Sequence, residues 1–213
     1  MTDVTGGVLL FGPPAAGKDT VTAALHDLDA RFSQLVKVKV GSGRTAGYRM
    51  ATEAQLSELR AAGRIVLETE RYGNTYAVDR EDLDALRDAG GFPVVHVGSV
   101  AHLRTFQASV ADPWLRVLLW LPRTECARRS AGRGDRDTGD RLAVWDATLE
   151  DLAAAAPTEA PFHLLLRTDQ RSAERTASVV RETFLAGPAR PATGRELVAF
   201  LREAALQETP AGN

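Results

Sequence analysis

The amino-acid sequence predicts an α/β fold in which a parallel sheet carries helices on both faces. Short apolar runs alternate with amphipathic helical patterns along most of the 213 residues, and such alternation is typical of strand–helix–strand units. The first apolar run leads directly into a glycine-rich turn and then into a helix. A composition of 44% apolar and 25% charged residues agrees with one compact domain and excludes a disordered chain.

Five apolar runs are the predicted strands of this sheet, at residues 8–11, 35–40, 93–97, 115–121 and 162–166. Helical patterns follow the glycine-rich turn as far as about residue 28 and then occupy residues 83–89, 101–109, 124–129, 141–154 and 172–184. Because helical segments connect these strands, the strands are expected to run in the same direction.

Two segments depart from this alternation of strands and helices. Residues 41–79 contain a glycine-rich turn, a helix near 53–62 and short strands at 65–69 and 75–78, which predicts an inserted lobe that binds a substrate. Residues 131–141 hold alternating arginines and aspartates among glycines between two helices. This pattern is expected of a mobile lid, although a solvated connecting loop has the same composition.

The chain is predicted to divide into a main domain, residues 1–185, and a C-terminal extension, residues 186–213. The extension begins with a linker rich in Pro, Gly and Ala and ends in an amphipathic helix. The apolar residues that share one face of this helix are Leu197, Phe200, Leu201 and Ala204. This face is expected to cap the core or to contact a neighbouring subunit, so a homo-oligomer is one expected arrangement.

The formal charge of the whole chain is −2, which provides no general attraction to nucleic acid or to an anionic membrane. We therefore expect neither as a partner, and any affinity for phosphate must come from a local site. The single cysteine, Cys126, excludes an internal disulfide. The N-terminus lacks the basic start and long apolar run of a signal peptide, so a cytoplasmic location is expected.

The glycine-rich turn has the spacing of a phosphate-binding loop, with four residues between Gly12 and Gly17 and with Lys18 directly after. Glycines let successive backbone amides turn inward around phosphate oxygens, and the start of the following helix adds its positive dipole. Lys18 is expected to reach the phosphoryl group that is transferred. The pattern predicts a P-loop NTPase fold that binds ATP. The predicted nucleotide contacts are Gly12, Pro13, Pro14, Ala15, Ala16, Gly17, Lys18, Asp19 and Thr20.

The position after Lys18 departs from the usual loop, because Asp19 stands where a serine or threonine normally helps to bind Mg²⁺. Since Mg²⁺ favours carboxylate oxygens, Asp19 can hold the metal directly or through water, or Thr20 can do so one position later. Alternatively, Asp19 only stabilises the first turn of its helix. The predicted metal ligands are Asp19 and Thr20.

Residues 8–184 resemble the guanylate kinase-like P-loop kinases, and within them the ribose 1,5-bisphosphate phosphokinases. The Gly-Lys-Asp run at residues 17–19 is similar to the phosphate loop of the bisphosphokinases, whereas guanylate kinases have Gly-Lys-Ser. Gly-Ser-Val-Ala-His-Leu at 98–103 is similar to a bisphosphokinase stretch, and Tyr-Gly-Asn-Thr-Tyr at 72–76 to a turn in both groups. Gly-Arg-Gly at 132–134, followed by Arg141, resembles their lid.

The resemblance implies that Arg44, Tyr48 and Tyr76 grip the phosphate of the acceptor. A guanidinium can bind two phosphate oxygens in a fork, and a phenol can donate one hydrogen bond. The arginine-rich turn before Tyr48 is shorter than in guanylate kinases. Arg44 therefore lacks the second arginine of the family, unless Arg49 or Arg71 serves.

The same resemblance implies lid arginines that gather around the migrating phosphoryl group. The catalytic candidates are Lys18, Arg133 and Arg141. Arg128, Arg129 and Arg136 are secondary candidates. An acid that orients the acceptor is expected among Asp19, Glu68 and Glu70. Further predicted substrate contacts are Glu68, Glu70 and Ser99.

The predicted base pocket lacks the groups that read guanine. Leu67 and Gly98 stand where guanylate kinases place carboxylates, and Val78 replaces a hydroxyl. None of these side chains accepts a hydrogen bond, and each unpaired donor of a buried base costs about 1–3 kcal/mol. GMP is therefore an unfavourable acceptor, unless a shift of one residue in the alignment brings Glu68 or Glu70 into the pocket.

These observations predict an ATP- and Mg²⁺-dependent phosphotransferase whose acceptor is a small phosphorylated ribosyl compound. The first candidate acceptor is ribose 1,5-bisphosphate, which would yield 5-phosphoribosyl diphosphate. One alternative is a nucleoside monophosphate kinase of unknown base preference. A second alternative is a non-catalytic guanylate kinase-like binding module, although such modules usually lack a working phosphate loop.

Overall fold

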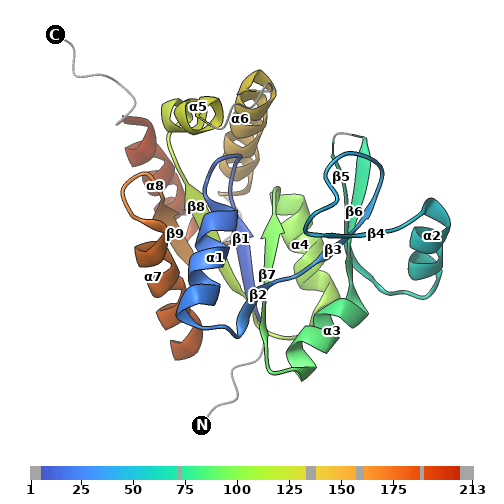
Figure 1. The fold of residues 1–213 in the computed structure, drawn as a ribbon. Helices are drawn as coiled ribbons and strands as arrows, with labels where there is room; N and C mark the ends of the chain where they lie inside the picture. Colours follow the sequence, from blue (N-terminus) through green and yellow to red (C-terminus); the bar gives the residue numbers. More distant parts are fainter. Residues whose placement is uncertain (1–5, 72, 133–137, 157–160, 188–189, 207–213) are drawn as a thin grey trace.

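The computed structural model describes residues 6–71, 73–132, 138–156, 161–187 and 190–206, and within them the chain forms two sheets (Figure 1). The core sheet has the strand order β2-β7-β1-β8-β9, and every pair in it is parallel. Its strands are β1 (Val8–Phe11), β2 (Phe32–Gln34), β7 (Phe92–Val97), β8 (Leu115–Trp120) and β9 (Leu164–Arg167). The second sheet has the order β4-β3-β6-β5 and consists of β3 (Lys37–Val40), β4 (Tyr48–Met50), β5 (Ile65–Arg71) and β6 (Asn74–Asp79).

Helices cover both faces of the core sheet, which confirms the predicted fold class. Helices α1 and α7 pack against each other on one face, and α4 contacts α6 on the other. Right-handed crossovers between parallel strands impose this arrangement. The helices are α1 (Lys18–Leu28), α2 (Glu53–Ala61), α3 (Arg80–Asp88), α4 (Val100–Ser109), α5 (Arg123–Ala131), α6 (Thr138–Ala155), α7 (Ala173–Ala186) and α8 (Gly194–Leu206).

The central strand β1 is completely buried, from Val8 to Phe11. A strand that is covered on both faces must be apolar at successive positions, and the run Val-Leu-Leu-Phe meets this requirement. Since β1 is fixed at the centre of the sheet, the glycine-rich turn that follows it lies at the carboxyl edge of the strands. Ligands of open α/β sheets bind at this edge.

The prediction of a core strand at 35–40 is wrong in its position. The strand that pairs with β7 is β2, where Phe32 is fully buried beside Phe92. The chain then crosses to the second sheet, and residues 37–40 form β3 between β4 and β6. The alternating pattern Lys-Val-Lys-Val suits a sheet with one buried face, whereas a central core strand would be apolar throughout.

The C-terminal helix α8 packs on the core of its own chain, which is one of the two expected arrangements. Leu197, Leu201 and Ala204 are buried in the main hydrophobic cluster, and Phe200 packs against its edge. A Cβ atom at Gly194 would lie 1.5 Å from the carbonyl oxygen of Ala156, so only glycine allows this close approach. None of the described helices is long and apolar enough to cross a membrane.

Candidate active site

The phosphate loop joins β1 to α1, and its backbone explains both of its glycines. Gly17 has a left-handed conformation (φ 85°), which residues with a side chain rarely adopt. At Gly12, a Cβ atom would lie 2.4 Å from the carbonyl oxygen of Leu119 in β8. The amides in the first turn of α1, which begins at Lys18, have no acceptor within the helix. The loop therefore offers backbone donors to a phosphate group.

The ammonium group of Lys18 points into this loop. Its Nζ donates hydrogen bonds to the carbonyl oxygens of Gly12, at 2.6 Å, and Pro13, at 2.9 Å. Burial lowers the pKa of Lys18 to about 8, and the positive charge of Arg71 acts in the same direction. A bound phosphate would favour the charged form of Lys18, because an opposite charge at short range offsets the cost of burial.

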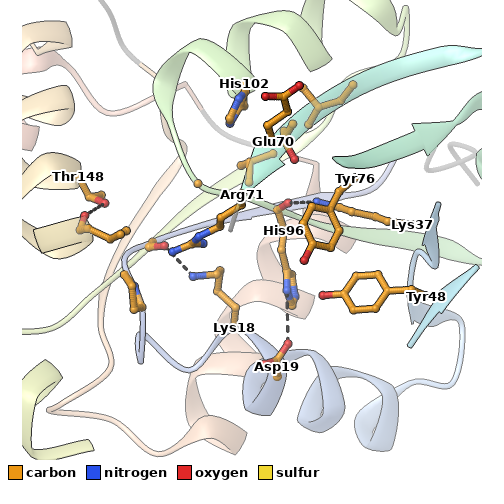
Figure 2. A pocket seen from close by; sticks show the side chains of 17 residues that line it. Lys18, Asp19, Lys37, Tyr48, Glu70, Arg71, Tyr76, His96, His102 and Thr148 are labelled. Atoms are coloured by element: carbon orange, nitrogen blue, oxygen red, sulfur yellow. Dashed lines mark hydrogen bonds and ion pairs between the residues drawn. The ribbon is translucent and has the colours of Figure 1, made fainter. Parts of the chain in front are cut away.

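A cleft of about 510 Å³ opens beside the phosphate loop, as Figure 2 shows. One wall comes from the carboxyl edge of the core sheet, at the phosphate loop and the end of β7, and the other from β3, β4, β5 and β6 of the second sheet. Helix α6 adds Val144 and Thr148. The lysines, arginine and carboxylates that line the cleft are Lys18, Asp19, Lys37, Glu70 and Arg71.

The alternation of side chains along β5 separates Arg71, which lines the cleft, from Glu68, which does not. Leu67 and Arg71 lie on the face that lines the cleft. Glu68 lies on the opposite face, where Arg60 of α2 pairs with its carboxylate at 2.7 Å and holds the pKa of that carboxyl below its usual range. Glu70 is exposed and lines the cleft. The structure therefore brings Glu70 to the predicted site, whereas Glu68 contributes to the packing of α2.

Tyr48 and Tyr76 lie together in the wall of the cleft, with ring centroids 5.3 Å apart. Lys39 lies behind them, with its Nζ 5.5 Å and 5.7 Å from the two centroids. The same ammonium donates hydrogen bonds to the carbonyl oxygens of Ser42, at 2.6 Å, and Arg44, at 2.8 Å. Lys39 thus joins the loop before β4 to the two tyrosines, both of which line the cleft (Figure 2).

Arg44, in contrast, lies outside the described lining of the cleft. It is exposed, and its Nε donates to a carbonyl oxygen of its own loop at 3.1 Å. Arg49 binds Asp79 and Asp82 on the far side of β4. Of the three arginines considered for the acceptor's phosphate, Arg71 is the one that lines the cleft. The structure thus combines Arg71, and not Arg44, with the two tyrosines.

Arg141, a catalytic candidate, lies beside the phosphate loop. It lines a hollow of about 290 Å³ together with Lys18 and Arg71. These three cations come from α6, α1 and β5, and they surround the space in front of the loop. Arg133 and Arg136 lie outside the described residues.

The two other secondary candidates form ion pairs with Glu125, within α5. Arg128 binds this carboxylate at 2.7 Å, and so does Arg129. Arg129 also donates hydrogen bonds to the carbonyl oxygens of Ala15, at 3.2 Å, and Thr168, at 2.8 Å. Arg129 therefore fixes the phosphate loop to the segment after β9, which is a structural contribution to the site.

The two predicted metal ligands face different spaces. Asp19 lines the cleft, and its Oδ1 lies 3.5 Å from Nδ1 of His96, whereas Thr20 lines a separate hollow beside α7. Burial, and then the charges of two neighbouring lysines, lower the pKa of His96 to about 3, so its ring is neutral. Its Nε2 lies 2.8 Å from Oγ1 of Thr22. The Thr22 hydroxyl donates its hydrogen to the carbonyl oxygen of Lys18 at 2.8 Å, so its oxygen accepts from His96, and the proton of the neutral ring lies on Nε2.

Ser99 forms the N-cap of α4, where its Oγ accepts a hydrogen bond from the amide of His102 at 3.1 Å. Its neighbours Gly98 and His102 line the cleft, while Ser99 lies outside the described lining. The capping pattern explains why a serine precedes this helix. The structure therefore assigns Ser99 to the start of α4.

Sequence reasoning missed Lys37 and Lys39. The Nζ of Lys37 donates to the carbonyl oxygen of His96 at 2.7 Å, and burial lowers its pKa to about 8. A signal for both residues was present in the composition. Of 26 lysines and arginines, only Lys18, Lys37 and Lys39 are lysines, and all three lie in or directly behind the cleft.

Comparisons with known proteins agree with this architecture. Neither a family model nor a curated protein matches the sequence. Among solved structures, a guanylate kinase from Anaplasma phagocytophilum is 18% identical, with a TM-score of 0.60 over 100% of both chains. A shikimate kinase from Acinetobacter baumannii in complex with shikimate is 14% identical, with a TM-score of 0.45 over 88% of this chain and 97% of the other. A sugar kinase from Janibacter sp. is 16% identical, with a TM-score of 0.48 over 85% and 95%.

The likeness to the guanylate kinase extends over the whole length of both chains, including the second sheet. The chain therefore has the fold of a P-loop kinase, and within that fold its phosphate loop and cleft occupy the carboxyl edge of the core sheet.

Proposed function

We propose that this protein is an ATP-dependent phosphotransferase whose acceptor is a small phosphorylated compound. The observation that carries this proposal is the convergence of Lys18, Arg71 and Arg141 on the space in front of the phosphate loop. Three cations from separate elements attract a polyanion that lies between them. In a chain of net charge −2, such a concentration of positive charge favours the phosphates of a donor and an acceptor.

The residues present fit ATP and Mg²⁺. The loop offers amide donors, and Lys18 is long enough to leave its carbonyl partners for a phosphate oxygen. Among the described residues, no group of three or more His, Cys, Asp or Glu could hold a metal ion, so Asp19 would hold Mg²⁺ together with the phosphates of the nucleotide. The metal would neutralise phosphate charge.

In the proposed reaction, an oxygen of the acceptor's phosphate forms a bond to the γ-phosphorus of ATP, and the bond between this phosphorus and the β,γ-bridging oxygen breaks. ADP carries away the electron pair of the broken bond. Lys18, Arg71 and Arg141 stabilise the charge on the transferring group. Tyr48 and Tyr76 hold the acceptor's phosphate in line for attack.

For the acceptor, we favour ribose 1,5-bisphosphate, with 5-phosphoribosyl diphosphate as the product. Leu67 and Gly98 line the part of the cleft where the resemblance would place carboxylates that read guanine, and Val78 is buried beside Leu67 in the sheet. These groups cannot accept hydrogen bonds from a base. A nucleoside monophosphate is the second candidate, favoured by the likeness of the fold to a guanylate kinase.

Release of ADP in a coupled assay tests the proposal. The panel contains ribose 1,5-bisphosphate, GMP, dGMP, AMP, CMP and UMP, each with ATP and Mg²⁺. We expect the highest kcat/KM with ribose 1,5-bisphosphate. We expect Lys18→Ala to lower kcat by at least about 100-fold, because it removes a charge that acts on the transferring group.

Arg60→Ala is the matched control, because it removes a cation of α2 that pairs with Glu68 on the face of the second sheet opposite the cleft. It should leave kcat within about twofold of the wild type. If the protein phosphorylates nucleotides and not ribose 1,5-bisphosphate, the acceptor is a nucleoside monophosphate, the second candidate. Absence of turnover with every acceptor, or full activity of Lys18→Ala, would contradict the kinase proposal and favour a non-catalytic binding module.

A further inference from the structure

Lys37 occupies a defined row of the second sheet. In β3 it pairs with Tyr48 of β4, and the register of β3 with β6, in which Val38 opposes Ala77, places Lys37 beside Val78. Val78 in turn opposes Leu67 of β5. The row across the cleft wall is therefore a tyrosine, a lysine and two apolar residues. Its single charge is an ammonium group, which can donate hydrogen bonds and cannot accept them.

The ammonium group of Lys37 forms a hydrogen bond to the protein backbone and no ion pair among the described residues. Among the residues that the structure describes, its Nζ has one hydrogen-bond acceptor, the carbonyl oxygen of His96, and no carboxylate pairs with it. The charge of Lys37 lowers the pKa of Lys18, His96 and His102, and the carboxylates that line the same cleft are those of Asp19 and Glu70. An ammonium group has three donors, so two of those of Lys37 can bind a ligand.

Such an arrangement lowers the stability of the folded chain, because a desolvated cation with one carbonyl partner costs free energy. A methionine would fill the same volume without this cost. The chain nevertheless places one of its three lysines here, although it uses arginine at its 23 other basic positions. A compact ammonium suits a confined position against the His96 carbonyl, whereas a planar guanidinium needs more room.

We propose that Lys37 forms a second anion subsite of the cleft, which binds the phosphate of the acceptor that does not receive the phosphoryl group. This inference rests on the proposed function and specifies its substrate class as a sugar bisphosphate. Arg71 and the two tyrosines hold the reacting phosphate beside the phosphate loop. Lys37 then holds the remote phosphate in the row with Val78 and Leu67. The N–H donors of a guanine ring would face this ammonium unfavourably, whereas phosphate oxygens satisfy it.

Binding in the absence of ATP tests this subsite independently of turnover. Calorimetry would compare ribose 1,5-bisphosphate with ribose 1-phosphate, which lacks the remote phosphate, for the wild type, Lys37→Met, Lys37→Arg and the control Arg60→Met. We expect the wild type to bind the bisphosphate at least about 30-fold more tightly, since a charge-assisted hydrogen bond contributes that much. Lys37→Met should reduce this ratio below about threefold, and Lys37→Arg should retain part of it.

Steady-state kinetics and thermal unfolding complete the test. Lys37→Met should raise KM for the bisphosphate and leave KM for ATP unchanged, and its melting temperature at pH 7 should equal or exceed that of the wild type. Arg60→Met should keep the full binding ratio. Equal binding of both sugars by the wild type, or an unchanged ratio in a folded Lys37→Met, would overturn the subsite.

A failure of the proposed function would give results different from those of a failure of the Lys37 subsite. If the bisphosphate binds preferentially and Lys37→Met removes that preference, but no variant releases ADP, the subsite stands and the kinase proposal fails. If the wild type releases ADP with the bisphosphate while Lys37→Met retains its KM, the kinase proposal stands and the subsite fails. Tight binding of GMP with no preference for the bisphosphate contradicts both the subsite and the choice of acceptor.

Discussion

Arg71 contributes the largest charge effect on Lys18, whose pKa is lowered first by burial and then by this arginine. Arg71 ends β5 and lines both the cleft and the hollow around the phosphate loop. An anion between Arg71 and Lys18 removes their repulsion and strengthens its own binding. We therefore expect the two residues to bind one phosphate group together, although they are far apart in the sequence.

Arg71→Met and Arg44→Met distinguish the arginine that the structure places at the cleft from the one predicted from sequence. We expect Arg71→Met to raise KM for the acceptor by about 10- to 100-fold, because a charge-assisted hydrogen bond to phosphate contributes about 1.5–3 kcal/mol. Arg44→Met should change KM by less than about threefold, since an exposed charge outside the cleft contributes little. Steady-state kinetics with varied acceptor measures both. A larger effect of Arg44→Met would mean that the loop at 41–47 rearranges when the acceptor binds.

The phosphate loop could be predicted residue by residue from the sequence, whereas the acceptor site could not. Gly12 and Gly17 act through local backbone geometry and Lys18 directly follows Gly17, so the spacing of the three residues identifies them. Glu68 and Arg71 lie only three residues apart, yet they face opposite sides of β5. The sequence contains this alternation but does not say which face meets the cleft.

At the level of elements, Asp79 joins the second sheet to the core. It ends β6, caps α3 through the amide of Glu81, and is fully buried. Burial by itself raises the pKa of Asp79, but hydrogen bonds from Arg64, the Glu81 amide and Arg49 outweigh this effect and leave the pKa below its usual value. Because β6 leads directly into α3, this network fixes the second sheet relative to α3, the helix through which the chain returns to the core sheet.

Asp79→Ala should lower the free energy of unfolding by about 2–3 kcal/mol, because it removes a helix cap and leaves two arginines without their buried partner. Arg49 and Arg64 both keep contact with water, which limits the loss. Since the folded-state pKa of Asp79 lies below the unfolded value, its contribution is complete above about pH 4 and disappears as the pH falls through the folded value. Urea unfolding at pH 7 and pH 3 should therefore show a large difference between variant and wild type at pH 7 and a smaller one at pH 3. Equal differences at both pH values would contradict the role of the ionised carboxylate.

At the scale of the whole molecule, the described residues form two separate hydrophobic clusters. The main cluster fills both sides of the core sheet and includes Val66, Leu67 and Val78 of the second sheet. The second cluster contains Val38, Leu56, Leu59 and Ala77, which lie between α2 and the second sheet. The phosphate loop belongs to the larger cluster, while β3 and β6, which carry Lys37 and Tyr76, contribute Val38 and Ala77 to the smaller one. The strands that carry Lys37 and Tyr76 therefore depend on the smaller cluster as well as the larger one, whereas the phosphate loop depends on the larger cluster.

Leu56→Ala tests this division, because Leu56 is fully buried in the small cluster. We expect a loss of about 2–4 kcal/mol that is confined to the lobe. Hydrogen exchange should accelerate in β3 and β6 and remain unchanged in β1 and β8, and KM for the acceptor should rise while KM for ATP stays constant. Leu118→Ala, in the buried core strand β8, is the control and should accelerate exchange throughout. Uniform acceleration in Leu56→Ala would show that the two clusters unfold as one unit.

The sequence by itself determined the fold class and the phosphate loop, because strand–helix alternation and glycine spacing are properties of neighbouring residues. The sequence also shows that lysine is rare in this chain, which distinguishes Lys37 and Lys39 from the other basic residues. Only the tertiary structure decided which charged residues meet at the cleft. Lys37, Arg71 and Arg141 come from β3, β5 and α6, and their convergence depends on how two sheets and a helix pack, which no local pattern encodes.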